Sequence, residues 1–154
     1  TLTVRGALWA MITYSDNTSG FLLLDRVGPG NINRDLQALG LTESAFGQED
    51  VISTAADMAL FLEMLVLQAA VSSEASREML DLMLAQKVRD RLPALLPPGA
   101  GVANKTGDLL EVTHDVGIVY APQPTYVIAV LSDRGGESEP IAVLSRAIYD
   151  YVNR

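Results

Sequence analysis

"MITYSDNTSGFLLLDRVG", residues 11–28, places three consecutive polar residues between two apolar segments with helical spacing. Burying such polar groups is costly unless they are hydrogen-bonded, so their side chains need partners at this point of the chain. Ser15, Asp16 and Asn17 are residue types that cap helices and form turns by bonding nearby backbone N–H groups. Taken alone, the stretch predicts a capped junction between two helices.

Helical patterns extend on both sides of this junction. Thr3 is a suitable N-cap for a first helix, and a second helix is predicted over residues 18–27, where Gly28 is placed to end it. A short helix follows to Leu39, and residues 41–50 are predicted to form a polar loop.

Two further helices have start signals of their own. Thr54 and Asp57 form a capping-box pattern that opens a helix with one apolar side. Either Ser72 or Ser73 caps the next helix, and the sequence leaves both alternatives open. Residues 1–92 are therefore predicted to be the helical part of the chain.

Strand-like segments replace helices after the Pro- and Gly-rich residues 93–101. The candidates are residues 101–107, 116–121 and 126–132, with a hairpin turn at 122–125 between the last two. A final helix with an apolar face follows. This order predicts an α+β fold in which residues 101–154 form three antiparallel strands and a C-terminal helix.

The strand predicted at residues 126–132 is apolar without alternation, which is typical of a strand covered on both faces and central in its sheet. In a three-stranded meander, however, this strand would lie at an edge. Long apolar edges promote aggregation, and proteins normally protect them. We therefore expect a further strand to pair beside it, and no other segment of this sequence is suited to supply one.

The composition excludes several classes of function. The chain has 154 residues and a net charge of −8 with no basic run, which argues against nucleic-acid binding. It has no cysteine and a single histidine, so neither a disulfide nor a metal site is expected, and no cofactor is implied. The longest apolar stretches are much shorter than a membrane span.

A second short motif, Lys105-Thr106-Gly107, lies in the first predicted strand. S-D-N at a helix junction followed by K-T-G on a strand resembles the signature of the serine β-lactamase and penicillin-binding protein superfamily. The segments "VANKTGDLLEVTHDVGIVYAP" and "YVIAVLSDRGGESE" are similar to its third to fifth strands, and the resemblance covers essentially the whole chain. It implies a β-lactamase/transpeptidase-like fold, with a normally five-stranded sheet, and acyl-enzyme chemistry on β-lactams or cell-wall peptides.

The resemblance also implies roles for the first motif. Ser15 would relay a proton to the leaving amide nitrogen of the substrate, as one of two catalytic residues. Asn17 would exchange hydrogen bonds with the side-chain amide of the substrate. Asp16 would hold the backbone of the junction and is therefore a structural residue.

The second motif supplies the other catalytic residue and the remaining substrate contacts. By resemblance, Lys105 provides positive potential near Ser15, and the Thr106 hydroxyl binds a substrate carboxylate. Gly107 lets the substrate lie along the strand edge. Asp108 follows directly, and a carboxylate opposite an anionic ligand raises a question of specificity.

Two features depart from the family pattern. No serine is followed by lysine three positions later, so the nucleophile motif Ser-x-x-Lys is absent. In the family this motif precedes S-D-N, so the chain resembles the C-terminal portion of one partial domain and is expected to be inactive alone. Between the motifs, the E-x-x-L-N pattern of fast β-lactamases is also absent, and neither Glu43 nor Glu49 is assigned its role.

These departures leave alternatives open. The completed domain is predicted to be a β-lactamase-like hydrolase, and a DD-peptidase-like enzyme or a non-catalytic peptide- or partner-binding protein is the alternative. Expected partners are a β-lactam or cell-wall peptide, together with a complementary N-terminal fragment or a second copy. By resemblance, the protein acts in an extracellular or periplasmic location.

Two remaining polar residues are assigned no catalytic role. His114 is interpreted as a surface or turn residue. Arg91 is interpreted as a surface charge or as an ion-pair partner of Asp90 or Asp115.

Overall fold

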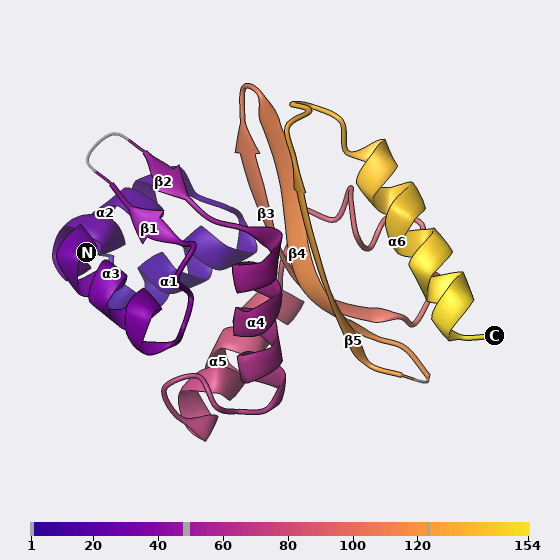
Figure 1. The fold of residues 1–154 in the computed structure, drawn as a ribbon, viewed down its shortest axis with the longest axis horizontal. Coiled ribbons are helices and arrows are strands. Elements are labelled where there is room, and N and C mark those ends of the chain that lie inside the picture. Colours follow the sequence, from indigo (N-terminus) through magenta and orange to yellow (C-terminus); the bar gives the residue numbers. More distant parts are fainter. Residues whose placement is uncertain (1, 48–49, 123) are drawn as a thin grey trace.

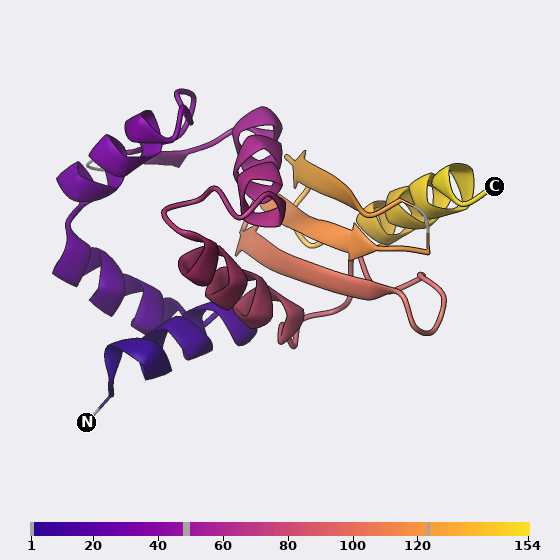
Figure 2. The same cartoon turned by 90° about the horizontal axis from the view of Figure 1, so that it is seen from below.

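The computed structural model describes residues 2–47, 50–122 and 124–154. Its elements are α1 (Val4–Thr13), α2 (Asn17–Val27), α3 (Pro29–Ala38), β1 (Ala45–Phe46), β2 (Val51–Ile52), α4 (Ala55–Val66), α5 (Ser73–Leu84), β3 (Gly101–Leu109), β4 (Val112–Tyr120), β5 (Tyr126–Ser132) and α6 (Glu139–Val152). Helices α4 and α5 cover one face of the β3–β4–β5 sheet, and α6 covers the other (Figure 1). The remaining helices lie beyond α4 and α5, on the side away from α6 (Figure 2). The predicted α+β class is confirmed.

Each face of the sheet has its own apolar core. The core under α4 and α5 contains buried Leu62, Leu65, Ala70, Met83, Ala103 and Ile118. The core under α6 contains buried Leu92, Val102, Val119, Ile128 and Ile141. Because neighbouring strand residues enter opposite cores, a slip of one residue in register would exchange the two faces. The two cores therefore fix which face each polar side chain of β3 occupies.

Strand β5 lies at one edge of the sheet, where its hydrogen-bonded neighbour among the described residues is β4. Val127 packs against the core under α4 and α5, and Ile128 lies in the core under α6. This two-sided cover explains why the strand lacks an alternating pattern, as expected from the sequence. The expected edge position is confirmed as well, and no further strand pairs with β5 within the described part of the chain.

The two strands of the first hairpin are longer than predicted. Strand β3 extends to Leu109 rather than residue 107, and β4 begins at Val112 rather than residue 116. The two strands pair without interruption up to Leu109 and Val112, so only two residues form the turn. The polar sequence Thr113-His114-Asp115 hid this part of β4, because it lacks the apolar pattern of a strand.

Residues 41–50 were predicted to form a polar loop, but part of this segment is a strand. Ala45 and Phe46 of β1 pair with β2 in a short antiparallel hairpin. The Asn33 side chain holds this hairpin against α3, because its Nδ2 donates to Phe46 O at 2.9 Å and its Oδ1 accepts from Phe46 N at 2.7 Å. Glu49 and residue 123 of the predicted 122–125 turn lie outside the described residues.

Side-chain caps begin the helices largely as predicted. The hydroxyl of Thr3 accepts a hydrogen bond from Gly6 N, and the hydroxyl of Ser72 accepts one from Ala75 N. Ser72, rather than Ser73, is therefore the cap of α5. Helix α2 begins one residue earlier than predicted, with Asp16 as its N-cap.

Thr54 caps α4 and links it to the segment before β1. Its Oγ1 accepts a hydrogen bond from Asp57 N at 3.2 Å and donates one to Glu43 Oε2 at 3.1 Å. We expect Thr54→Ala to lower the free energy of unfolding by about 1 kcal/mol, because the cap is lost. Urea denaturation measures this loss. Thr54→Ser keeps the hydroxyl and is the matched control, and an equal loss in both variants would contradict the capping argument.

Candidate active site

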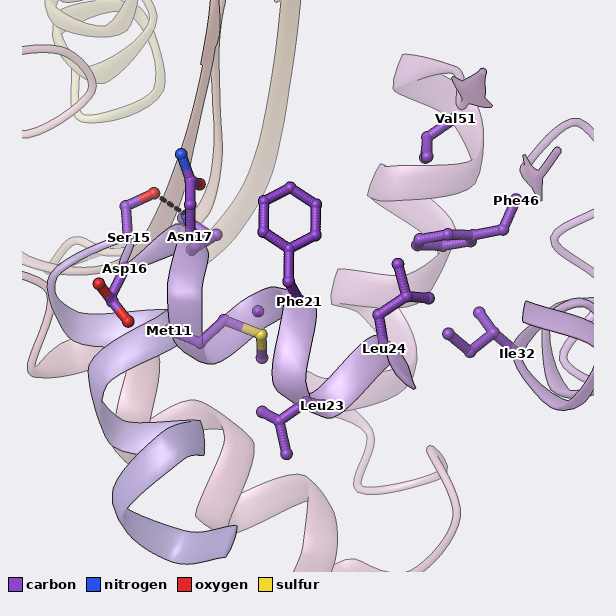
Figure 3. A pocket seen from close by; sticks show the side chains of 12 residues that line it. Met11, Ser15, Asp16, Asn17, Phe21, Leu23, Leu24, Ile32, Phe46 and Val51 are labelled. Carbon is purple, nitrogen blue, oxygen red and sulfur yellow. Dashed lines mark hydrogen bonds between the residues drawn. The ribbon is translucent and has the colours of Figure 1, made fainter. Parts of the chain in front are cut away.

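The junction between α1 and α2 presents Ser15 in an unusual backbone conformation. Its φ of 56° lies in the left-handed region, which non-glycine residues adopt only when their surroundings fix them there. The junction is fixed by Asp16, whose N–H donates to Ala10 O at 3.2 Å and whose Oδ2 accepts from Ser19 N at 2.7 Å. Hydrogen bonding by Ser19 lowers the pKa of Asp16. Figure 3 shows the Asp16 carboxylate pointing away from the Asn17 side chain.

Lys105 connects this junction to β3. Its Nζ donates to Ser15 Oγ at 2.7 Å and to Thr106 O at 2.6 Å. The first of these bonds joins residues that are 90 positions apart in the sequence (Figure 3). Burial lowers the pKa of Lys105, while the carboxylates of Asp115 and Asp108 oppose this effect. The hydrogen bond therefore places a partly buried cationic group directly against the Ser15 hydroxyl.

A groove of about 980 Å³ brings the predicted site residues together. Five of them line it: Ser15, Asn17, Lys105, Thr106 and Gly107. The sixth, Asp16, lines a neighbouring apolar pocket of about 460 Å³ that also contains Ser15, Asn17 and Lys105. Figure 3 shows Phe21, Leu24 and Phe46 in this second pocket. The polar residues of the two motifs therefore line the groove, whereas the neighbouring pocket is lined mainly by apolar side chains.

Thr106 has a buried hydroxyl whose hydrogen-bonding capacity is unused. Its Oγ1 has no partner among the described residues, although the residue is only 4% exposed. An unsatisfied buried hydroxyl is costly, so its persistence calls for an explanation. Thr106 is among the residues that line the groove, but its Oγ1 is shielded from solvent in this conformation.

His114 does not lie in a turn, which was one of the two sequence interpretations, but it is partly exposed in the groove, as the other allowed. It lies within β4, pairs with Gly107 of β3 and is half-buried. Its Nδ1 accepts a hydrogen bond from Ser132 N at 3.0 Å. The histidine therefore links two neighbouring strands in the wall of the groove.

Arg91 is buried, and its interpretation as a surface charge was wrong. Its side chain is 6% exposed, and its Nη2 forms an ion pair with Asp108 Oδ1 at 2.6 Å. Nη1 donates to His114 O at 2.8 Å. The predicted ion pair with Asp90 is present at 3.6 Å. No direct pair with Asp115 is found among the described residues.

Asp115 forms its hydrogen bonds with residues other than Arg91. The completely buried carboxylate accepts hydrogen bonds from Leu92 N at 3.0 Å and from Asn104 Nδ2 at 3.0 and 3.2 Å. Desolvation raises its pKa from 3.8 to about 6. Sequence analysis missed this buried pair and the pairing of Asp108 with Arg91. The available signal was alternation, since Asn104, Thr106 and Asp108 recur at every second position of one strand.

Neither a metal centre nor a membrane span is found in the described parts of the chain. Their His, Asp and Glu side chains form no group of three or more that could hold a metal ion. None of their helices combines the length and the apolar character needed to cross a bilayer.

Comparisons with known proteins show which solved structures share this fold. Among solved structures, PBP-A is 28% identical to the chain with a TM-score of 0.91, over 98% of this chain and 62% of its own. A β-lactamase from Sphaerobacter thermophilus is 27% identical with a TM-score of 0.92, over 99% of this chain and 64% of its own. A PBP-A variant solved as an acyl-enzyme complex with penicillin G is also 28% identical, with a TM-score of 0.91.

The chain thus spans less than two thirds of the length of PBP-A and of the Sphaerobacter enzyme. The similarity nevertheless extends over nearly all of its own residues and confirms the β-lactamase-like fold. A family model described as the beta-lactamase enzyme family matches residues 1–152. The chain therefore belongs to the beta-lactamase enzyme family.

Proposed function

We propose that the chain contributes the proton-relay and substrate-binding side of a serine acyl-enzyme hydrolase acting on β-lactams or cell-wall peptides. The observation that supports this most directly is the 2.7 Å hydrogen bond from Lys105 Nζ to Ser15 Oγ. It joins the two motifs at the wall of one groove. Acyl transfer needs a proton donor for the leaving nitrogen and positive potential for a bound anion, and this pair can supply both.

The catalytic roles follow from this pair. Ser15 Oγ donates its proton to the departing nitrogen and takes a proton in return from the general base that activated the nucleophile. Lys105 stabilises the hydroxyl oxygen during this relay by hydrogen bonding and charge. Asp16 keeps Ser15 in its left-handed conformation and has a structural role, which its bond to Ser19 N supports.

The binding roles belong to three residues that line the groove. Thr106 lines the groove, and its unpartnered hydroxyl donates to a substrate carboxylate once the side chain turns toward the groove. Asn17 is exposed and exchanges hydrogen bonds with a substrate amide. A Cβ at Gly107 would meet His114 Cδ2 only at 3.5 Å, an ordinary contact, so the packing of the fold does not itself require glycine. Room for the substrate along β3 is therefore the proposed reason for this residue.

We further infer that a complementary N-terminal fragment supplies the nucleophile and that the chain alone is inactive. The sequence has no Ser-x-x-Lys. The apolar pocket beside the groove and the single-sided pairing of β5 support a covering partner, either that fragment or a second copy. By analogy with the family, the proposed location is extracellular or periplasmic.

A DD-peptidase-like enzyme with slow deacylation is the second candidate function. Glu43 accepts a hydrogen bond from Thr54 Oγ1, so its carboxylate stabilises the helix start. On the β2 side, the described lining of the groove consists of Val51, Ile52 and Ser53. These residues include no carboxylate that could activate a deacylating water. A non-catalytic protein that binds a peptide or partner in the groove is the remaining alternative.

Denaturing intact-mass spectrometry after incubation with benzylpenicillin tests the proposal. We expect a preparation that contains the proposed complementary fragment to gain the mass of one penicillin on the polypeptide that carries Ser-x-x-Lys. The isolated chain should gain none, and it should not turn over a chromogenic cephalosporin. Turnover by the verified lone chain would contradict its inactivity. An absence of adduct on every polypeptide would favour the non-catalytic binding protein.

A further inference from the structure

Two serine hydroxyls connect the groove to a buried carboxylate. Ser53 follows β2, is exposed and lines the groove. Its Oγ lies 2.9 Å from Ser44 Oγ, and Ser44 Oγ donates to Asp57 Oδ2 at 2.8 Å. Ser44 is 4% exposed, and Asp57, in the first turn of α4, is 5% exposed. The carboxylate of Asp57 is therefore two hydrogen bonds away from a residue of the groove wall.

The direction of these hydrogen bonds follows from the number of protons that the two hydroxyls carry. A serine hydroxyl has one proton to donate and two lone pairs that accept. Ser44 donates its single proton to Asp57, so the bond between the two serines is donated by Ser53. The proton of Ser53 is then used as well. Toward a ligand in the groove, Ser53 Oγ can therefore act only as a hydrogen-bond acceptor.

Further hydrogen bonds hold Asp57 in place. Its Oδ2 also accepts from Glu43 N at 2.9 Å, and its own backbone N–H donates to Thr54 Oγ1 at 3.2 Å. In a connected chain of hydrogen bonds, each bond polarises the next one, and a carboxylate at one end strengthens this effect. The oxygen of Ser53 is therefore a stronger acceptor than the oxygen of an isolated serine hydroxyl.

The groove wall beside Ser53 is apolar. Phe46, Val51 and Ile52 line the groove on this side. Ligand sites with mainly apolar walls obtain their specificity from a few well-placed polar groups. A single acceptor in such a wall selects a ligand group that donates a hydrogen bond. An ammonium group is favoured most, because charge-assisted hydrogen bonds are the stronger ones and the negative charge of Asp57 attracts a cation.

We propose that Ser53 is a specificity-determining residue that binds an ammonium group on the acyl side chain of the substrate. Ser15 and Lys105 line the same groove, so a substrate bound at this pair can extend toward Ser53. The inference rests on the proposed function and narrows its substrate class. Among β-lactams and cell-wall peptides, the groove favours those whose acyl side chain carries an amino group over those without one.

NMR titration of the isotope-labelled chain tests this proposal without requiring acylation. The probes are ampicillin, whose acyl side chain carries an amino group, and benzylpenicillin, which lacks this group and is otherwise the same. Because both share the β-lactam nucleus and its carboxylate, other contacts with the groove cancel in the ratio of their affinities. We expect ampicillin to bind about fivefold more tightly, and we expect Ser53→Ala to abolish this preference.

Two control variants separate the hydroxyl of Ser53 from general effects of substitution. Ser53→Thr keeps a hydroxyl at the same position. Ser73→Ala removes a hydroxyl from an exposed position of α5 that does not line the groove. Both variants should keep the preference for ampicillin, and the dispersion of the NMR signals shows that each variant is folded.

A purely structural role of Ser53 predicts a different result. In that case Ser53→Ala would lower the free energy of unfolding but leave the ratio of the two affinities unchanged. The proposal is overturned when Ser53→Ala keeps the preference. It is also overturned when the natural chain binds the two penicillins equally or binds neither of them.

This proposal and the proposed function fail in different ways. If no polypeptide is acylated by penicillin but the preference for ampicillin depends on Ser53, the acyl-enzyme proposal fails and the role of Ser53 stands. If acylation occurs and the preference is absent or independent of Ser53, the role of Ser53 fails and the enzyme proposal stands.

Discussion

Lys105→Ala is expected to lower the second-order rate constant for acylation by benzylpenicillin of the chain combined with its proposed complementary fragment by roughly 10³-fold. The substitution removes the ammonium that is bonded to Ser15 Oγ at 2.7 Å and with it the positive potential of the groove. Both the proton relay and the attraction for the substrate carboxylate are lost together. The rate is measured by following adduct formation with time in intact-mass spectra.

The sequence offers a matched control, because its other lysine is Lys87. Lys87 is exposed, and its backbone N–H, which donates to Thr13 O, is retained in alanine. Lys87→Ala should therefore be acylated at the rate of the natural protein. Lys105→Arg keeps the charge but changes its geometry, so an intermediate rate is expected. Acylation of Lys105→Ala at the unchanged rate would remove Lys105 from the proposed mechanism.

Local sequence signals predicted the helices well because their ends are marked by side chains that act within a few residues. Thr3, Thr54 and Ser72 each cap the helix that follows them. The β1–β2 hairpin was missed because its support is not local. Asn33, thirteen positions away from Phe46, supplies both hydrogen bonds that hold its backbone. A pattern read along the chain does not contain such a contact.

In the candidate site, too, local motifs were predictable from the sequence and contacts between distant residues were not. The S-D-N and K-T-G motifs could be identified in the sequence, and the structure places Ser15 and Lys105 in contact. Arg91 was misjudged because its burial depends on the packing of three segments around it. Its partners Asp108, His114 and Ser138 lie 17, 23 and 47 positions away. Residue type alone could not distinguish this buried arginine from a surface charge.

The free energy of unfolding is expected to fall by about 2 to 3 kcal/mol between pH 4 and pH 7 because of Asp115. Desolvation raises the pKa of this carboxyl from 3.8 to about 6 in the folded protein. At pH values between the pKa of 3.8 in the unfolded chain and the pKa of about 6 in the folded protein, Asp115 keeps its proton in the folded protein and has lost it in the unfolded chain. Stability is therefore lost as the pH rises through this window, and little further change comes from Asp115 above about pH 7.

Asp115→Asn isolates this effect, because asparagine cannot ionise and can still accept the hydrogen bond from Leu92 N. Urea denaturation of the natural protein and of the variant, at several pH values from 4 to 7.5, gives the two stability profiles. Subtracting one profile from the other removes the contributions of groups that both proteins share. The difference should change by about 2 to 3 kcal/mol over this range.

Asp25→Asn is a suitable control, since it removes an exposed carboxylate and should keep the pH dependence of the natural protein. Burial and hydrogen bonding shift the pKa of Asp115 in opposite directions, so whether stability falls or rises with pH shows which of the two dominates. If Asp115 were stabilised mainly by its hydrogen bonds from Asn104 and Leu92 N, its pKa would be lowered and stability would rise with pH instead. A profile that rises between pH 4 and pH 7 in the natural protein but not in Asp115→Asn would therefore show that hydrogen bonding outweighs desolvation at this site.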